Sequence, residues 1–171
     1  MITQEELKKV LHYNKDSGVF VWIIKPCKNI SINSVAGTLV NGYIYIRLNK
    51  KRYAVHRLAW LYEYGVMPSK HLDHINRIKS DNRIANLRDV SHSENHKNMP
   101  KQSNNTSGVV GVKWDKSRNR WSAYIKVEQK NIFLGRYVEF SEAVNARKNA
   151  EILYGFHENH GKDLDNEYEL Y

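Results

Sequence analysis

The sequence predicts an α+β protein in which short hairpins and helices are followed by a three-stranded antiparallel sheet packed on one helix. Apolar and polar residues alternate over several short segments, as in strands that are buried on one face. Helical spacing is confined to a few segments that follow capping residues. A polar run between these halves is typical of a linker. We therefore expect a first domain at 1–98, a linker at 99–106, a second domain at 107–160 and an acidic tail at 161–171.

The first domain opens with a capping box, because the Thr3 hydroxyl can cap a helix and Glu6 can reach back to it. A short helix should follow, with Leu7, Val10 and Leu11 on one face. β-branched and aromatic runs predict strands, and further capping signals predict helices. These are strands at 19–22, 43–48 and 53–55, a helix at 57–64 ended by Gly65, and a helix from Ser91 through Asn98. Residues 66–90 show little regular periodicity.

Three closely spaced strands are predicted in the second domain, at 109–114, 121–127 and 131–137. In the middle strand the odd-numbered side chains from Trp121 to Val127 should point one way, and Tyr124 and Lys126 the other. The apolar face of this sheet needs a cover. A helix with Ser141 as its N-cap and Gly155 at its end supplies one, since its alanines recur at near-helical spacing.

The charge distribution predicts a negatively charged partner. Lys and Arg number 27 against 18 Asp and Glu, so the net charge is +9. Residues 97–136 hold nine Lys and Arg and two acidic residues, beside several aromatic residues. Such a basic block with aromatic neighbours is typical of nucleic-acid-binding proteins. A basic surface that binds nothing specific is the simpler alternative.

Several classes of protein are excluded or disfavoured by composition. Cys27 is the only cysteine, so neither an intrachain disulfide nor a cysteine-based zinc site is possible. Apolar runs stay well short of the roughly 18 residues that a membrane-spanning helix needs. The first residues lack the basic-then-apolar pattern of a secretory signal. We expect an intracellular protein, in the host cytoplasm or nucleoid, that is not secreted and has no membrane partner and no small-molecule substrate.

One cluster of side chains has the composition of a hydrolytic site. Asp73 and Asn95 can offer a carboxylate and an amide oxygen, the ligands that a hard divalent cation prefers. His74 has the side chain best suited to take a proton from water near neutral pH. Asn86 stands in a turn-like setting where its amide can tie loop backbone together. Each residue alone has an ordinary structural explanation, and only the ordered set favours chemistry.

That ordered set resembles the HNH endonuclease family, and more narrowly its phage and intron-encoded, homing-type group in which the final histidine is replaced by asparagine. The resemblance covers about residues 1–98. Its motifs are His56-Arg57-Leu58-Ala59-Trp60, Asp73-His74-Ile75-Asn76, Asp81-Asn82-Arg83, Asn86-Leu87-Arg88 and Asn95-His96-Lys97-Asn98, together with the hairpin around Gly42-Tyr43-Ile44-Tyr45-Ile46.

The resemblance implies a ββα-metal fold and a role for each matching residue. His74 would be the general base and Asn86 would hold its loop in register. Asp73 and Asn95 would bind one divalent cation, Mg²⁺ or alternatively Mn²⁺, with His96 and Asn98 as other choices for the second ligand. His56 is interpreted as structural or DNA-contacting. The implied reaction hydrolyses DNA to 5′-phosphate and 3′-hydroxyl ends.

The second domain resembles the APETALA-type domain of plant ethylene-response factors, over about residues 105–160. The motifs are Ser107-Gly108-Val109-Val110-Gly111-Val112-Lys113-Trp114, Arg120-Trp121-Ser122-Ala123-Tyr124-Ile125-Lys126, Phe133-Leu134-Gly135-Arg136-Tyr137 and Glu142-Ala143-Val144-Asn145-Ala146. In this family the sheet lies in the DNA major groove, which is wide enough for strands. The implied DNA contacts are Lys113, Tyr124, Lys126 and Phe133, with Arg118 and Arg120 as phosphate contacts. Lys113, Tyr124 and Phe133 differ from the usual plant residues, so base preference does not transfer.

Three functions are consistent with these patterns. The favoured one is a site-specific, homing-type endonuclease that acts on double-stranded DNA as a monomer or homodimer. The alternative is a DNA-binding regulator with a decayed nuclease module, which the intact set of Asp73, His74, Asn86 and Asn95 disfavours. A basic RNA-binding protein is a third alternative, because Tyr124 and Phe133 could stack on bases.

Overall fold

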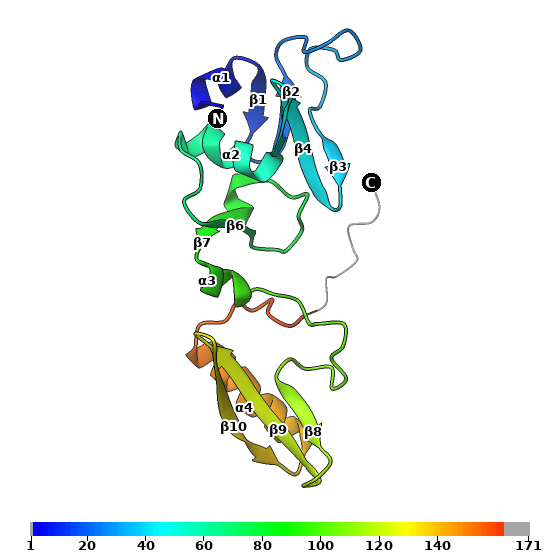
Figure 1. Cartoon of the computed structure of the whole chain (residues 1–171), viewed down its shortest axis with the longest axis vertical. Coiled ribbons are helices and arrows are strands. Elements are labelled where there is room, and N and C mark those ends of the chain that lie inside the picture. The colour runs from blue at the N-terminus through cyan, green and yellow to red at the C-terminus, as the bar shows by residue number, and fades with distance from the viewer. Residues whose placement is uncertain (1, 163–171) are drawn as a thin grey trace. The chain divides into compact units, whose positions relative to one another are not determined.

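Two separately packed units make up the chain in the computed structural model, Met1–His92 and Ser93–Tyr171. The structure describes residues 2–162, apart from the side chains of His92 and Ser93. The acidic tail predicted at 161–171 therefore lies almost entirely outside the described residues. The elements are mixed α and β, with four small antiparallel sheets and few helices among the described residues (Figure 1). No described helix is long and apolar enough to cross a membrane.

The first unit begins with helix α1 (Gln4–Lys8), which has the capping box predicted at Thr3 and Glu6. The hairpin of β1 (Leu11–Asn14) and β2 (Val19–Trp22) follows, and then a three-stranded sheet in the order β3 (Thr38–Val40), β4 (Tyr43–Leu48), β5 (Lys51–Ala54). Helix α2 (Val55–Tyr64) ends at Gly65, which adopts the left-handed conformation typical of a C-cap. The second hairpin consists of β6 (His71–His74) and β7 (Leu87–Val90), with the 3-10 turn η1 (Ile84–Asn86) just before β7.

Apolar side chains from α1, α2 and the hairpins form the core of this unit. Leu7, Leu11 and Leu58 are fully buried, and Phe20 and Ile46 are nearly so. Burial of such side chains contributes roughly 1.5–3 kcal/mol each relative to exposure. This core holds α2 and the β6–β7 hairpin in one unit, because Leu87 of β7 belongs to the same cluster.

The second unit contains α3 (His92–His96, which begins at its boundary), β8 (Val112–Asp115), β9 (Arg120–Val127), β10 (Lys130–Tyr137) and α4 (Phe140–Leu153). The strand order β10-β9-β8 is antiparallel throughout. Ala123 and Ile125 of β9 are buried, and Ala143 of α4 packs into the same core as Ala123. The three-stranded sheet packed on one helix, as predicted from the sequence, is thus present in this unit.

Some local predictions differ from the structure. Leu11 belongs to β1 and not to the first helix, which ends at Lys8 because the following residues pair with β2. Ser141 lies inside α4 and is not its N-cap. The cap is Glu139, which forms a capping box with Glu142. Strands β1, β3, β6 and β7 were not predicted from the sequence.

Candidate active site and basic surfaces

The β6–β7 hairpin carries two of the predicted site residues side by side. Asp73 and His74 are the last residues of β6 and face Arg88 and Leu87 of β7 in the strand register. Consecutive strand residues point to opposite faces, so the two side chains diverge. His74 is 5% exposed. The Asp73 carboxylate accepts hydrogen bonds from Arg88 Nε at 3.0 Å and Nη2 at 2.7 Å, both on Oδ2.

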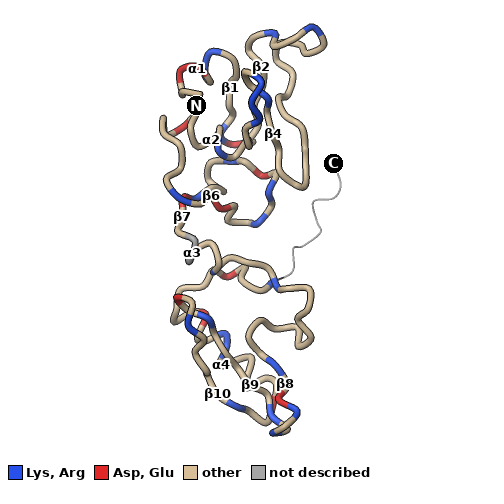
Figure 2. Tube along the Cα trace, in the orientation of Figure 1, with Lys and Arg blue, Asp and Glu red and all other residues tan. Residues whose placement is uncertain are grey.

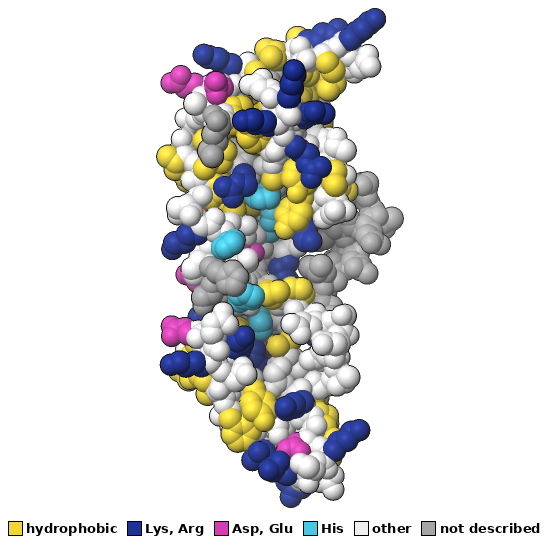
Figure 3. Space-filling view, in the orientation of Figure 1, with side chains coloured by type: hydrophobic (Ala, Val, Ile, Leu, Met, Phe, Trp, Pro, Cys, Tyr) yellow, Lys and Arg dark blue, Asp and Glu magenta, His cyan; other side chains and the backbone are white. Residues whose placement is uncertain are grey.

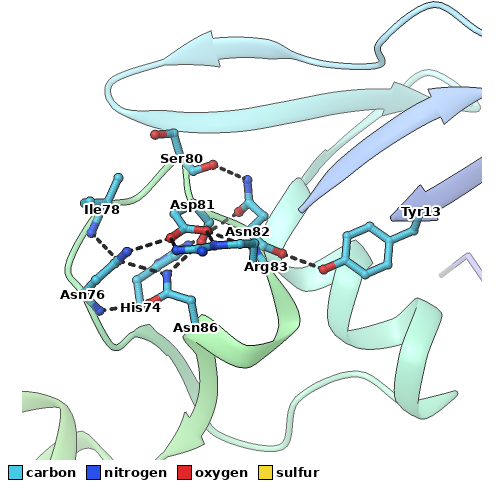
Figure 4. A network of polar contacts seen from close by, with 9 residues as sticks. All are labelled: Tyr13, His74, Asn76, Ile78, Ser80, Asp81, Asn82, Arg83 and Asn86. Atoms are coloured by element: carbon cyan, nitrogen blue, oxygen red, sulfur yellow. Dashed lines mark hydrogen bonds and ion pairs between the residues drawn. The ribbon is translucent and has the colours of Figure 1, made fainter. Parts of the chain in front are cut away.

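Asn86 ties down the loop that leaves β6 (Figure 4). Its Oδ1 accepts from the Asn76 N–H at 3.0 Å, and its Nδ2 donates to Asn76 Oδ1 at 2.9 Å and to the Asp81 carbonyl at 2.9 Å. The Ile75 N–H donates to the Asn86 carbonyl at 2.9 Å. Because the side chain is 7% exposed, these bonds are made in a largely dry setting where an unmet partner is costly.

An ion pair closes the other end of the same loop. Arg83 donates to both carboxylate oxygens of Asp81, at 2.8 and 2.6 Å, and Asn76 Nδ2 donates to Asp81 Oδ2 at 2.7 Å. Burial alone would raise the pKa of Asp81, but the bonds from Arg83 and Asn76 outweigh it and lower that pKa. Gly18, in the β1–β2 turn, has positive φ and lies so close to Arg83 that a Cβ there would be 2.5 Å from the Arg83 backbone nitrogen. The loop is thereby held against the first hairpin.

The orientation of Asn82 favours one tautomer of His74. Asn82 Nδ2 donates to the Ser80 carbonyl at 2.9 Å, so its Oδ1 is the atom that faces His74 Nε2, at 3.5 Å. An acceptor at that position favours the tautomer in which Nε2 carries the proton and Nδ1 the lone pair. Asn82 is itself held by Tyr13, whose hydroxyl donates to its carbonyl at 2.7 Å. Burial lowers the pKa of His74, with Asn82 and Asp73 acting in the opposite direction.

Two further rings surround His74. The His56 ring centre lies 5.2 Å from that of His74 in an edge-on arrangement, and the Tyr43 ring lies 6.1 Å from His74. His56 belongs to the first turn of α2, and its Nδ1 is buried with no hydrogen-bond partner among the described residues. Burial, then the neighbouring His74 and Arg57, lower the pKa of His56 to about 4. His56 therefore lies beside the candidate base. Its position in the sequence motif did not reveal this proximity.

The oxygen donor of Asp73 fits a hard divalent cation better than a softer metal that prefers nitrogen or sulfur ligands. Among the described residues no three His, Cys, Asp or Glu side chains gather into a metal-binding group. A cation at Asp73 would thus be held by one carboxylate with amide, backbone or water oxygens, which suits Mg²⁺ or Mn²⁺. Asn95 lies half-buried on α3, in the second unit. Its role as the second ligand stays a prediction.

A basic and aromatic face of the first unit was not predicted from the sequence. Arg47 of β4 stands directly opposite Arg52 of β5, and both are exposed. The Arg52 guanidinium lies over the Tyr45 ring at 4.0 Å. Like charges placed opposite each other in a strand pair are destabilising unless an anion accompanies them. Figure 2 shows the Lys and Arg gathered along this hairpin. The concentration of Lys and Arg at Arg47, Lys50, Lys51 and Arg52 could have indicated this face.

The six predicted nucleic-acid contacts all lie in the second unit. Lys113, Lys126 and Phe133 are exposed, and Tyr124 is half-buried. Tyr124 and Phe133 are register partners with ring centres 5.1 Å apart, and Lys113 Nζ lies 5.0 Å from the Tyr124 ring centre. Lys113, Tyr124 and Phe133 therefore form one group on the sheet.

The two predicted phosphate contacts stand at the β8–β9 turn. Arg118 and Arg120 are exposed, and Arg118 forms an ion pair of 3.3 Å with Asp115. Figure 3 shows Lys and Arg side chains gathered at this end of the unit.

The segment that holds the candidate base matches a known protein family. Residues 53–97 match the family model described as HNH endonuclease. The chain carries an HNH endonuclease domain there. Protein 3.8 of Escherichia phage T7 is 33% identical over 76 residues, which are 44% of this chain and 63% of that protein. No solved structure gives a match.

The match to the HNH endonuclease family includes all four candidate residues, Asp73, His74, Asn86 and Asn95. The family that this model describes consists of endonucleases, which usually use a divalent metal. The match ends at residue 97. The relation of the second unit to the APETALA-type domain therefore stays a proposal.

Proposed function

We propose that this protein is a metal-dependent, site-specific DNA endonuclease of the homing type, in which His74 is the general base. The observation that carries the proposal is the loop of the HNH domain, which Asn86 fixes through three hydrogen bonds just after His74. A base must be held in position to deprotonate a water efficiently. The bonds of Asn86 anchor the loop that follows His74 and thereby help to hold the base in position.

In the proposed reaction His74 takes a proton from the attacking water through Nδ1, the nitrogen left with a lone pair when Nε2 faces Asn82. Asp73 and Asn95 would hold one divalent cation, Mg²⁺ or alternatively Mn²⁺, which supplies positive charge at the scissile phosphate and the departing 3′ oxygen. Arg88 occupies Asp73 Oδ2 and balances the carboxylate charge. The products would carry a 5′ phosphate and a 3′ hydroxyl.

A line of aromatic and basic side chains leads toward His74 and supports duplex DNA as the substrate. The Tyr45 ring is 6.4 Å from that of Tyr43, which in turn contacts His74. Lys79 Nζ lies 5.1 Å from the Tyr43 ring centre. Together with the opposed Arg47 and Arg52, these groups could neutralise phosphates along one strand.

The second unit is proposed to read DNA through the β8–β9–β10 sheet. An HNH module that contacts only phosphates can recognise little of the DNA sequence, so the contacts to bases must come from another part of the protein. Tyr124, Lys126, Lys113 and Phe133 would face the major groove, with Arg118 and Arg120 on phosphates. The exposure of the cations and the pairing of the two rings support this proposal.

The test is cleavage of supercoiled plasmid and phage genomic DNA in Mg²⁺, Mn²⁺ or EDTA. We expect metal-dependent nicked circles, linear DNA or discrete fragments, and none of these with His74→Ala. Open circles without linear product would indicate nicking of one strand. Absence of cleavage, with tight duplex binding retained, would favour a DNA-binding regulator with a decayed nuclease module. Tighter binding of RNA than of duplex DNA would contradict both.

A further inference from the structure

A cavity of about 510 Å³ lies within the second unit, where β9 extends past the end of β8. β8 pairs with β9 only from Val112↔Ala123 to Asp115↔Arg120. The rest of β9, from Tyr124 onward, forms one wall. The other walls come from the segment after α3 and from residues after α4. This volume lies in the range of small-ligand sites.

The cavity is positively charged. Its described lining includes four Lys and Arg side chains and one acidic side chain, Glu128. Lys113 and Lys126 approach it from the sheet, and Arg147 approaches it from α4. A ligand with a negative charge is therefore favoured.

Arg147 is the feature of the cavity that points most directly to a ligand. Its side chain is 2% exposed, yet only part of the guanidinium is satisfied. Nε donates to the Val110 carbonyl at 2.9 Å, and Nη2 lies 3.3 Å from Glu151 Oε1 and 3.2 Å from His160 Nε2. Nη1 is buried with no hydrogen-bond partner among the described residues. Glu151 is also shared with Lys148, at 2.8 Å, so one carboxylate balances two cations. A buried, charged donor without an acceptor is costly, and an anion in the cavity would supply that acceptor.

Aromatic rings stand beside the cations. Tyr124 lies under Lys113, and the Phe156 ring is 5.3 Å from the Arg147 guanidinium. Amide side chains of Asn104 and Asn131 also line the cavity. Flat apolar faces, amides and cations together match one chemical class, an aromatic base joined to a phosphate.

We propose that this cavity binds one nucleotide, with its phosphate toward the cations and its base against the rings. The proposal rests on the proposed function in one respect: Lys113, Tyr124 and Lys126 belong both to the cavity and to the proposed DNA-contacting face. The nucleotide has two possible sources. It is either a residue turned out of the bound DNA strand, as in enzymes that extrude a base from the stack, or a free mononucleotide.

The first experiment is calorimetric titration of the full chain in EDTA with dAMP, dTMP, deoxyadenosine and inorganic phosphate. We expect dAMP and dTMP to bind at least tenfold more tightly than deoxyadenosine or phosphate. Deoxyadenosine has the base without the phosphate, and inorganic phosphate has no base. Asn104→Trp, which fills the cavity from an exposed position, should weaken dAMP binding at least tenfold. Ser103→Trp is the matched control, since Ser103 is an exposed neighbour that does not line the cavity. Asn131→Trp, from the opposite wall, repeats the test if Asn104→Trp melts at a lower temperature.

The second experiment distinguishes the sources with a duplex that holds 2-aminopurine in a mismatched pair, where unstacking costs least. Brightening with the wild type, lost in Asn104→Trp and kept in Ser103→Trp, would identify a nucleotide of the DNA strand. Binding of dAMP without brightening would identify the free mononucleotide.

Absence of dAMP and dTMP binding at millimolar ligand, in protein that still binds duplex, would overturn the inference and leave the nuclease standing. Equal binding by Asn104→Trp and Ser103→Trp would also overturn it. Nucleotide binding by protein that never cuts DNA would remove only the proposed function.

Discussion

Asn86 and Asn76 bond to each other reciprocally: the Asn86 oxygen accepts from the Asn76 backbone N–H, and the Asn86 amide donates to the Asn76 side-chain oxygen. Two amides thus join the start of β7 to the loop that follows β6. Since Asn76 also donates to Asp81, this set of hydrogen bonds extends across the loop to the ion pair of Asp81 and Arg83. The loop after the candidate base is therefore fixed by two neutral amides together with the ion pair of Asp81 and Arg83.

We predict that Asn86→Ala lowers the cleavage rate by about 100-fold, the effect expected when a reacting group is displaced by roughly 1 Å. Duplex affinity should change little, because Asn86 is buried and cannot reach DNA. The measurement is single-turnover plasmid cleavage beside duplex binding. Asn29→Ala is the control, since Asn29 is exposed in a distant loop of the same unit. Full cleavage by Asn86→Ala would show that the hydrogen bonds of Asn86 are not needed for catalysis.

His74→Ala should remove the general base, and its cleavage should fall by about 10²–10⁴-fold. Duplex binding should stay nearly intact because the side chain is 5% exposed and adds no charge to the surface. His71→Ala changes an exposed histidine on the same strand and should cleave normally. Equal loss in both variants would point to damage of the β6–β7 hairpin instead of loss of a base.

Asp73→Asn should abolish binding of Mn²⁺, because a neutral amide is a much weaker ligand for a hard cation than a carboxylate. The variant should keep its hairpin, since the amide oxygen introduced by the substitution can still accept from Arg88. Electron paramagnetic resonance of Mn²⁺ measures binding without DNA. Asp89→Asn is the matched control: Asp89 lies on the paired strand and accepts from Ser69 and Lys70. Unchanged Mn²⁺ binding by Asp73→Asn would exclude Asp73 as a ligand.

The strands and helices that could be predicted from sequence are those with long, regular patterns. The run of aromatic and β-branched residues from Tyr43 to Leu48 predicts β4 with its observed bounds, and the alternation from Trp121 to Val127 predicts most of β9. Ser122 departs from that alternation. Although it lies on the opposite side of β9, it is fully buried. Alternation along a strand predicts on which face of the sheet each side chain lies, but it does not predict which loops cover that face.

The candidate site was only partly accessible to sequence reasoning. Motif order brought Asp73, His74 and Asn86 together in one hypothesis, and the structure places all three at the β6–β7 hairpin. The bond from Tyr13 to Asn82 spans 69 residues of sequence, and Gly18 approaches Arg83 from the same hairpin. No local pattern reveals such contacts. The burial of Arg147 on α4 was not predicted, because no local sequence pattern reveals the burial of a cation.

Lys126→Ala should lower the salt dependence of duplex binding by about one unit of slope in log K against log salt, as expected for loss of one phosphate contact. The residue is exposed on β9 and carries its charge into solvent. Filter binding or anisotropy at several salt concentrations measures the slope. Lys148→Ala is the control, since Lys148 lies on α4 and already pairs with Glu151. An unchanged slope in Lys126→Ala would argue against that contact.

His56 makes stability depend on pH in a defined direction. Burial is the main cause that lowers its pKa to about 4 in the folded protein, followed by His74 and Arg57. An unfolded histidine has a pKa of about 6.5. The unfolded chain therefore takes up a proton at higher pH than the folded one. The free energy of unfolding should be greatest above about pH 7, fall as the pH drops through the window from about 6.5 to 4, and level off below it.

His56→Phe keeps a ring beside His74 but removes the titration, and its stability should fall less over this window. The difference from wild type should reach at most about 3 kcal/mol, the free-energy equivalent of the lowered pKa. Urea unfolding at pH 7, 6, 5 and 4 measures it for both proteins. His12→Phe, at an exposed position on β1, should follow the wild-type curve. Parallel curves for wild type and His56→Phe would mean that the His56 ring admits a proton in the fold, and the buried Nδ1 would then have to reach water or an acceptor.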